Sequence, residues 1–244
     1  MAGFSFQRRV LGLGYRIVRL MRIVPFAVLA VFFGLGGCAI VEDIKKSQAE
    51  AREERERAEL RKLALAEHAV FREAGGWKKR TYRNKALLSQ ATSDNVSLEI
   101  SLSEQRGFLL VRTAIAMDFP VATGRKSHPT PAGDFTIRAK EKNYSSNLYG
   151  KIYDAQNVLL VGDADARTDI VPEGGRFEGA TMPYWMRLTD SGVGMHVGYV
   201  PGRPASHGCI RLKHDSATEL FELVKVGTPV VIAENAPSLT PAPK

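Results

Sequence analysis

The chain has few cysteines, and its basic character is confined to one end. Only two cysteines, Cys38 and Cys209, occur in 244 residues, which is too few for a secreted domain held together by disulfides. Residues 86–244 carry 16 basic and 17 acidic side chains, so this part lacks the basic surface of a nucleic-acid-binding domain. The sequence has no internal repeat. These absences argue against a disulfide scaffold, a repeat architecture and a nucleic-acid partner.

Acidic residues are absent from the first 37 positions, which carry five arginines. Residues 23–37 then form an uncharged apolar run of 15, which is short for a membrane span of about 20 residues. A basic segment followed by such a run is typical of a bacterial secretory signal. We therefore expect the rest of the chain to lie on the periplasmic side of a cell envelope.

The apolar run ends in Leu35-Gly36-Gly37-Cys38, which resembles a bacterial lipobox. The resemblance implies that Cys38 is lipidated and becomes the mature N-terminus, with several acyl chains anchoring the protein durably to a membrane. Two alternatives are an uncleaved anchor over residues 23–41 and a soluble protein cleaved from its signal. Residues 1–37 are therefore predicted to be a signal peptide or a membrane anchor.

Glycine and proline are absent between residues 42 and 74, where Ala, Glu, Arg, Lys and Leu dominate. This composition favours a helix. The apolar residues do not recur as sustained heptads, so a coiled coil is not expected. We predict that residues 38–85 form a charged helical spacer, with its helix ending at Gly75-Gly76. The spacer would either lift the next domain toward the cell wall or simply link it.

Residues 86–235 have the pattern of a mainly β domain, because short apolar runs alternate with polar residues and turn signals. Asp215 is a suitable N-cap for one helix that extends through Val224. Residues 139–180 have weak periodicity and are predicted to be a long irregular segment. The Pro-rich residues 236–244 are predicted to be a disordered tail. The expected strands cover residues 96–102, 108–117, 119–123, 135–138, 182–188, 193–199 and 229–233.

A free cysteine in an oxidising compartment is a liability unless the protein uses it, although a cysteine in apolar surroundings is more often an inert core residue. Three neighbours favour a reactive role for Cys209. His207 lies two residues before it, Gly208 permits close approach of the backbone to a ligand, and His196 ends an apolar strand upstream. This segment can supply a base and oxyanion donors to a thiolate nucleophile.

The segment Ser206-His207-Gly208-Cys209-Ile210-Arg211-Leu212, preceded by a strand that ends in His196, resembles the catalytic motif of YkuD-type L,D-transpeptidases. The similarity extends to residues 124–135 and to Met182-Pro183-Tyr184, and it covers residues 95–234. It implies the family's β-sandwich catalytic domain, with a short helix near the C-terminus. The loop of nine residues between His196 and the motif is shorter than in many members.

The resemblance implies an enzyme that acts on peptidoglycan stem peptides. Cys209 would attack the carbonyl before the terminal D-Ala, form a thioester and transfer the acyl group to an amine of another stem or of a protein. His196 would be the general base, with a backbone carbonyl as its partner, and would give the thiol a low apparent pKa. With water as acceptor the enzyme would be a carboxypeptidase or amidase, and a non-catalytic wall-binding lipoprotein is a third hypothesis.

The resemblance also implies roles for the rest of the motif. His207 would orient or polarise the thiol, and the N–H groups of Gly208 and the cysteine would form part of an oxyanion hole. Ser206 would fix the loop by hydrogen bonding. Arg211 would hold a carboxylate or brace the loop, although it is equally suited to pair with Asp215.

Two further side chains, His128 and Tyr184, are predicted to contact substrate. The alternatives are that His128 is a solvated loop residue and that Tyr184 belongs to the core or to a groove wall. By residue type, a zinc site could be formed by His196, His207, Cys209 and His214. These residues lack the usual ligand spacing, so no metal or other cofactor is expected. We expect a monomer.

Overall fold

The computed structural model describes residues 26–237 and, from residue 40 onward, their side chains. The chain divides into two compact units, residues 1–54 and 55–244. Most of the predicted signal or anchor lies outside the described residues, as do the side chain of Cys38 and residues 238–244 of the predicted tail. The site of the predicted chemistry lies entirely in the second unit.

One continuous helix, α1 (Phe26–Glu73), includes both the end of the apolar run and the charged spacer. The helix predicted from composition is therefore present, but it begins earlier than expected. It ends before Gly75-Gly76, as predicted, and Gly76 adopts a φ of 77°, a left-handed conformation that suits glycine at a helix end. Among the described residues, no helix is long and apolar enough to cross a membrane.

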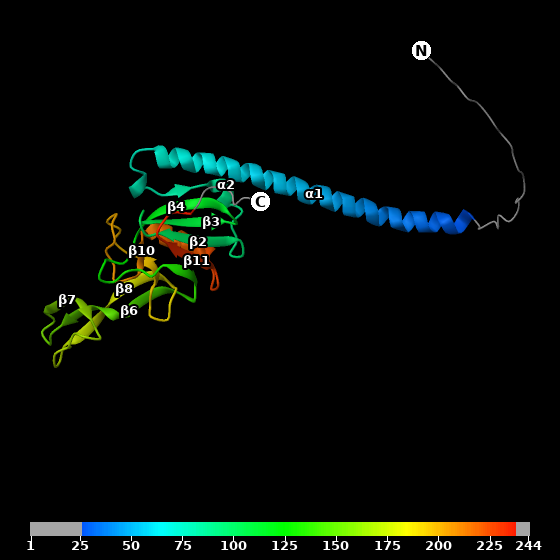
Figure 1. Cartoon of the computed structure of the whole chain (residues 1–244). Coiled ribbons are helices and arrows are strands. Elements are labelled where there is room, and N and C mark those ends of the chain that lie inside the picture. Colours follow the sequence, from blue (N-terminus) through cyan, green and yellow to red (C-terminus); the bar gives the residue numbers. More distant parts are fainter. Residues whose placement is uncertain (1–25, 238–244) are drawn as a thin grey trace, which may run out of the picture. The chain divides into compact units, whose positions relative to one another are not determined.

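The second unit is built on one mixed sheet, most of whose strands are labelled in Figure 1. The strand order is β5-β11-β2-β3-β4-β10-β9-β8-β6-β7, and β1 pairs with β4. Two pairs are parallel, β9 with β10 and β2 with β11. This confirms the mainly β class. The strands are β1 (Tyr82–Arg83), β2 (Val96–Ser101), β3 (Arg106–Val111), β4 (Ala114–Ala122), β5 (Gly133–Thr136), β6 (Ala139–Tyr153), β7 (Leu159–Asp165), β8 (Arg176–Arg187), β9 (Gly194–Val197), β10 (Ile210–Leu212) and β11 (Pro229–Ala233).

Two short helices, α2 (Lys85–Leu88) and α3 (His214–Leu223), complete the unit, with a 3-10 turn η1 (Trp77–Lys79). The predicted helix near the C-terminus is α3, but its N-cap is Lys213 rather than Asp215. Asp215 lies instead in the first turn, where a carboxylate also suits the positive end of the helix dipole. Leu220 of α3 is fully buried against the same core as Met195 of β9 and Ile210 of β10, so this core holds the two strands of the predicted site.

The prediction of an irregular segment over residues 139–180 is wrong. This segment forms β6, β7 and the first part of β8, which lie side by side and extend away from β2 and β3 (Figure 1). We call residues 144–181 the arm. Few arm side chains are fully buried, and the buried positions of β6 include Ser146 and Gly150. The pairing of β6 with β8 also shifts register between Ser145 and Gly150. The apolar–polar alternation that identifies a half-buried strand is therefore missing.

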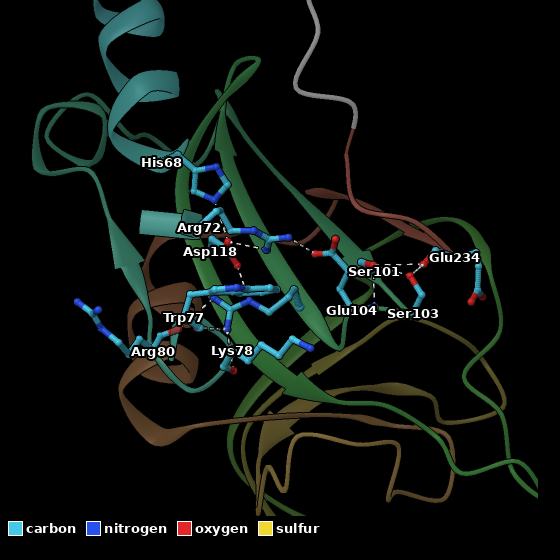
Figure 2. A network of polar contacts seen from close by, with 11 residues as sticks. His68, Arg72, Trp77, Lys78, Arg80, Ser101, Ser103, Glu104, Asp118 and Glu234 are labelled. Carbon is cyan, nitrogen blue, oxygen red and sulfur yellow. Dashed lines mark hydrogen bonds and ion pairs between the residues drawn. The ribbon is translucent and has the colours of Figure 1, made fainter. Parts of the chain in front are cut away.

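The last turns of α1 pack against the sheet through a buried charged cluster (Figure 2). Asp118 of β4 accepts hydrogen bonds from Arg106 Nε at 2.6 Å and from Arg72 Nη1 at 3.1 Å, and it lies 2.8 Å from His68 Nε2. Arg106, which is fully buried, also donates to the carbonyls of residues 77, 78 and 80. The end of the predicted spacer is thus part of the folded unit, and β1 extends this contact by pairing with β4.

Candidate active site

The parallel strands β9 and β10 place His196 next to Arg211 in register. Their neighbours Met195 and Ile210 form the adjacent pair and are both fully buried in the core. Because successive side chains point to opposite faces of a strand, His196 and Arg211 project from the other face of the sheet. Cys209 directly precedes β10, so the loop before this strand carries the thiol to the same face.

A cavity of about 480 Å³ lies over this face. Its wall includes five residues of the predicted site together with arm residues from β6 and β7, although the two groups lie far apart in the sequence. The structure thus brings the candidate nucleophile, the candidate base and the candidate carboxylate-binding arginine to one enclosed space. The predicted residues in the wall are His196, Ser206, His207, Cys209 and Arg211, and the arm contributes Tyr144, Tyr149 and Asp163 among others.

The imidazole of His196 is buried and has a fixed orientation. Its Nδ1 lies 2.8 Å from the carbonyl oxygen of Val197, so the expected carbonyl partner is present. A carbonyl oxygen only accepts hydrogen bonds, hence Nδ1 carries the proton and Nε2 keeps a lone pair. Burial, with a smaller contribution from Arg211, lowers the pKa of His196 to about 4, although the Val197 carbonyl acts in the opposite direction. At neutral pH the ring is therefore an uncharged base.

The Cys209 thiol is protonated at neutral pH. Burial raises its pKa above the ordinary value, although the Gly194 N–H and Arg211 act in the opposite direction. Burial therefore acts against the low thiol pKa that is expected from the sequence. Sγ lies 3.6 Å from the Gly192 carbonyl oxygen, and within the described part of the chain no hydrogen bond joins it to a histidine. The resting pair is a neutral thiol and a neutral imidazole, not an ion pair.

The loop before Cys209 is held by buried hydroxyl groups. Ser206 Oγ donates to the Cys209 carbonyl and accepts the Gly208 N–H at 3.1 Å. Thr130 Oγ1 donates to the Gly208 carbonyl at 2.7 Å and accepts the Gly124 N–H at 2.8 Å. Gly208 has a φ of 110°, which residues with a side chain rarely adopt. Because the Gly208 N–H already has an acceptor, the Cys209 N–H is the better candidate for an oxyanion donor.

Arg211 faces the cavity without a partner of its own. Its predicted alternative partner, Asp215, instead accepts a hydrogen bond from Arg83 at 3.0 Å, and Arg83 also binds Glu219 at 2.7 Å. Among the described residues, no hydrogen bond or ion pair engages the Arg211 guanidinium. The interpretation as a structural Arg211–Asp215 pair is therefore wrong, and the charge is available to a ligand. Gly198 leaves room for its stem, because a Cβ there would lie 2.9 Å from Arg211 carbons.

Comparison with known proteins agrees with this geometry. Residues 95–232 match the family model of the YkuD L,D-transpeptidase catalytic domain. The chain belongs to this family. The chain is 29% identical over 120 residues to probable L,D-transpeptidase 3 of Mycobacterium tuberculosis (strain ATCC 25618 / H37Rv), an alignment that covers 47% of this chain and 38% of that protein.

A second relative of this YkuD domain is L,D-transpeptidase 1 of the same strain, 32% identical over 122 residues, 46% of this chain and 40% of the relative. The alignments thus span about two fifths of the length of these curated relatives. Among solved structures, an L,D-transpeptidase from Mycobacterium smegmatis is 22% identical, with a TM-score of 0.44 and coverage of 57% of this chain and 58% of that chain.

Two predicted contact residues of the YkuD domain lie away from the cavity wall. Tyr184 packs edge-on against Phe221 and His214, with ring centroids 5.4 and 5.6 Å apart, so the structure does not bring it to the site. His128 packs edge-on against His207 at 4.9 Å and supports the site from behind its wall. Among the described residues, no group of three or more His, Cys, Asp or Glu side chains is arranged to hold a metal ion.

Sequence reasoning missed Arg125 and the arm residues of the YkuD domain. Arg125 contacts His207 Nε2, and Tyr149 stacks on the same ring with centroids 4.5 Å apart. Arg167 donates to the Tyr149 hydroxyl at 2.8 Å. Most of these residues lie in the segment predicted to be irregular, and Arg125 stands in a short polar turn. No local pattern could have indicated them, because their role depends on how the arm folds over the loop.

A second cavity of about 260 Å³ adjoins the first. The two share residues of β6 and of the turn before β9. Tyr144, which lies in both walls, stacks on Trp185 with centroids 5.0 Å apart and an angle of 13° between the rings. The face of the YkuD domain around Cys209 therefore has two adjacent hollows. The shared residues are Tyr144, Asn147, Leu148, Ser191 and Gly192.

Proposed function

We propose that this protein is a peptidoglycan L,D-transpeptidase in which Cys209 is the nucleophile and His196 is the general base. The observation that supports this most strongly is the fixed tautomer of His196. Its Nδ1–H is bound to the Val197 carbonyl, and its Nε2 lone pair remains free in the cavity wall that also contains Cys209. A neutral imidazole with a free lone pair can accept the thiol proton.

In the first half-reaction, Sγ of Cys209 bonds to the carbonyl carbon before the terminal D-Ala of a tetrapeptide stem. Because the thiol is neutral at rest, its proton passes to His196 Nε2 as the bond forms. The oxyanion is stabilised by the backbone N–H of Cys209. The C–N bond then breaks, D-Ala leaves as an amine with the proton from His196, and a thioester remains on Cys209.

In the second half-reaction, an amine of another stem or of a protein attacks the thioester and gives its proton to His196. The C–S bond breaks, and the sulfur recovers that proton. The second cavity beside Gly192 offers space for an acceptor. Arg211, which has no hydrogen-bond or ion-pair partner among the described residues, binds a carboxylate of the donor stem. No cofactor takes part in this scheme.

We further propose that the protein works as a monomer on the periplasmic side of the cell envelope, held at a membrane by lipid on Cys38. The support is the lipobox-like sequence that ends at this residue. Mass spectrometry of the membrane-extracted protein should find an acylated Cys38 at the N-terminus. A protein that starts at Met1, or one released after cleavage elsewhere, would refute the lipid anchor but not the chemistry.

Acylation by a carbapenem tests the nucleophile and the base, because the β-lactam carbonyl mimics the donor carbonyl. Intact mass spectrometry should show one adduct on the wild type and none on Cys209→Ala. His196→Ala should acylate about 10²- to 10⁴-fold more slowly, whereas His214→Ala, an exposed histidine on α3, should react normally. An unchanged rate in His196→Ala would remove His196 as the base, and correctly folded wild type without an adduct would refute the nucleophile.

A further inference from the structure

The ring of His207 is held on several sides by groups from different elements. Arg125 contacts its Nε2 from the loop after β4. Tyr149 of β6 stacks on its face at 4.5 Å, and His128 meets its edge at 4.9 Å. Asp163 of β7 places Oδ2 3.3 Å from Nε2. The side chain of His207 is only 15% exposed, so these contacts define its environment.

The contact with Arg125 determines where the proton of His207 resides. A guanidinium carries only donors and stays charged at any pH at which the protein is folded, so it can bind Nε2 only as an acceptor. A neutral imidazole that accepts at Nε2 carries its one proton on Nδ1. Asp163 alone would favour a proton on Nε2 of His207. However, Oδ2 of Asp163 also lies 3.4 Å from Nη1 of Arg125, so the negative charge of the carboxylate is partly offset by this guanidinium.

The surroundings of the ring, apart from Asp163, also disfavour a second proton on it. Burial lowers the pKa of His207, the charges of Arg125, His128 and Arg211 lower it further, and Asp163 opposes them. Among the described residues, no group accepts a hydrogen bond from Nδ1. The Nδ1–H is therefore the one donor that His207 can offer to a molecule in the cavity.

We propose that Arg125 is a positioning residue, which keeps His207 neutral with its proton on Nδ1 and so makes it a hydrogen-bond donor to the bound peptide. The peptide ligand rests on the proposed function, whereas the tautomer does not. The two histidines then have complementary tasks, because His196 offers a lone pair and His207 offers an N–H. Arg125 is tied to the same loop as the nucleophile, since its backbone N–H donates to the Ser206 carbonyl at 3.0 Å.

Long-range ¹H–¹⁵N NMR of the imidazole nitrogens measures the tautomer directly. The full chain with Cys209→Ala avoids oxidation of the thiol, and His207→Gln assigns the signals. Between pH 6 and 8, roughly the range in which an ordinary histidine titrates, Nδ1 of His207 should give the signal of a protonated nitrogen. Nε2 should give that of an unprotonated one. A proton on Nε2, or on both nitrogens, in this protein would overturn the proposal.

Arg125→Gln removes the charge, after which Asp163 should draw a proton to Nε2. The titration midpoint of His207 should then rise by at least about one pH unit, whereas Arg125→Lys should hold it low. Arg176→Gln on the arm, an arginine that pairs with Glu178, is the charge-matched control and should change nothing. An unchanged tautomer and midpoint in Arg125→Gln would also overturn the proposal. Because none of these readouts requires turnover, their failure is distinct from a failure of transpeptidation.

Discussion

At the scale of single residues, the chemistry of the site depends on neighbouring groups that can only accept or only donate hydrogen bonds. Val197 offers His196 a carbonyl, which keeps the proton on Nδ1 and leaves Nε2 free. Burial keeps both the imidazole of His196 and the thiol of Cys209 uncharged. In the proposed reaction, the proton therefore moves during attack rather than before it, and this distinguishes the proposal from one with a preformed thiolate–imidazolium pair.

The neutral pair predicts a characteristic pH profile for acylation of Cys209 by a carbapenem. The reactive form needs an unprotonated His196, whose pKa is about 4. The second-order rate constant should therefore stay level between about pH 6 and 8 and fall only near the pKa of His196. It should rise again only above the ordinary thiol range, because the thiol pKa is raised. Stopped-flow kinetics would contradict this account if the acid limb had its midpoint near 6.5.

The unpartnered guanidinium of Arg211 predicts a preference for donors with a free carboxylate. A charge-assisted hydrogen bond contributes about 1.5–3 kcal/mol, so Arg211→Gln should lower kcat/KM about tenfold to hundredfold for a tetrapeptide that ends in a carboxylate. The same peptide with a C-terminal amide is the matched substrate, and its kcat/KM should change little when Arg211 is replaced by Gln. Equal losses for both peptides would show that Arg211 shapes the site without binding the carboxylate.

The sequence predicted the residues that belong to one short segment, and it missed those that depend on distant contacts. Cys209, His196 and the carbonyl partner of His196 followed from local order and from the family motif. Arg125, Tyr149 and Asp163 did not, because they reach His207 only through the folding of the arm. Tyr184 was wrongly placed at the site because, despite its proximity to the motif in sequence, it packs on α3.

At the scale of elements, the alternation of side chains between the two faces of a strand determines which of them reach the cavity. His196 and Arg211 are paired in register, and their buried neighbours Met195 and Ile210 lock that register into the core. The arm is different, because few of its side chains are fully buried and no apolar stripe marks its strands. The end of α1 was interpreted as a solvated spacer for a related reason. Its contact with the sheet includes the buried Ala64 and the polar side chains of His68 and Arg72. A composition-based prediction treats the two polar residues as surface residues.

The buried cluster around Asp118 predicts a large loss of stability on substitution. Asp118→Ala leaves the fully buried guanidinium of Arg106 without its carboxylate, and breaking such a buried pair costs about 3–5 kcal/mol. Urea denaturation measures the free energy of unfolding. Asp94→Ala removes the exposed partner of Lys225 and should cost about 1 kcal/mol or less. Similar losses in both variants would show that the cluster contributes no more than a surface pair.

At the scale of the whole molecule, the catalytic unit begins earlier than the family motif suggests. The compact unit starts at residue 55, and it includes the end of α1 and strand β1. A fragment of residues 86–244 should therefore melt at a much lower temperature than one of residues 55–244, because it exposes Asp118 and leaves an edge of β4 unpaired. Differential scanning calorimetry compares the two fragments. Equal melting temperatures would mean that residues 55–85 are a linker after all.

The central claim is that Cys209 transfers a stem peptide to an amine. The most direct measurement incubates the protein with tetrapeptide-bearing muropeptides, with Cys209→Ala in parallel, and follows the products by mass spectrometry. The account predicts dimers formed with loss of D-Ala, in the wild type alone. Loss of D-Ala that yields only tripeptides would identify water as the acceptor. Muropeptides left intact by a folded wild type that nevertheless reacts with a carbapenem would contradict the assignment of these stems as the substrate.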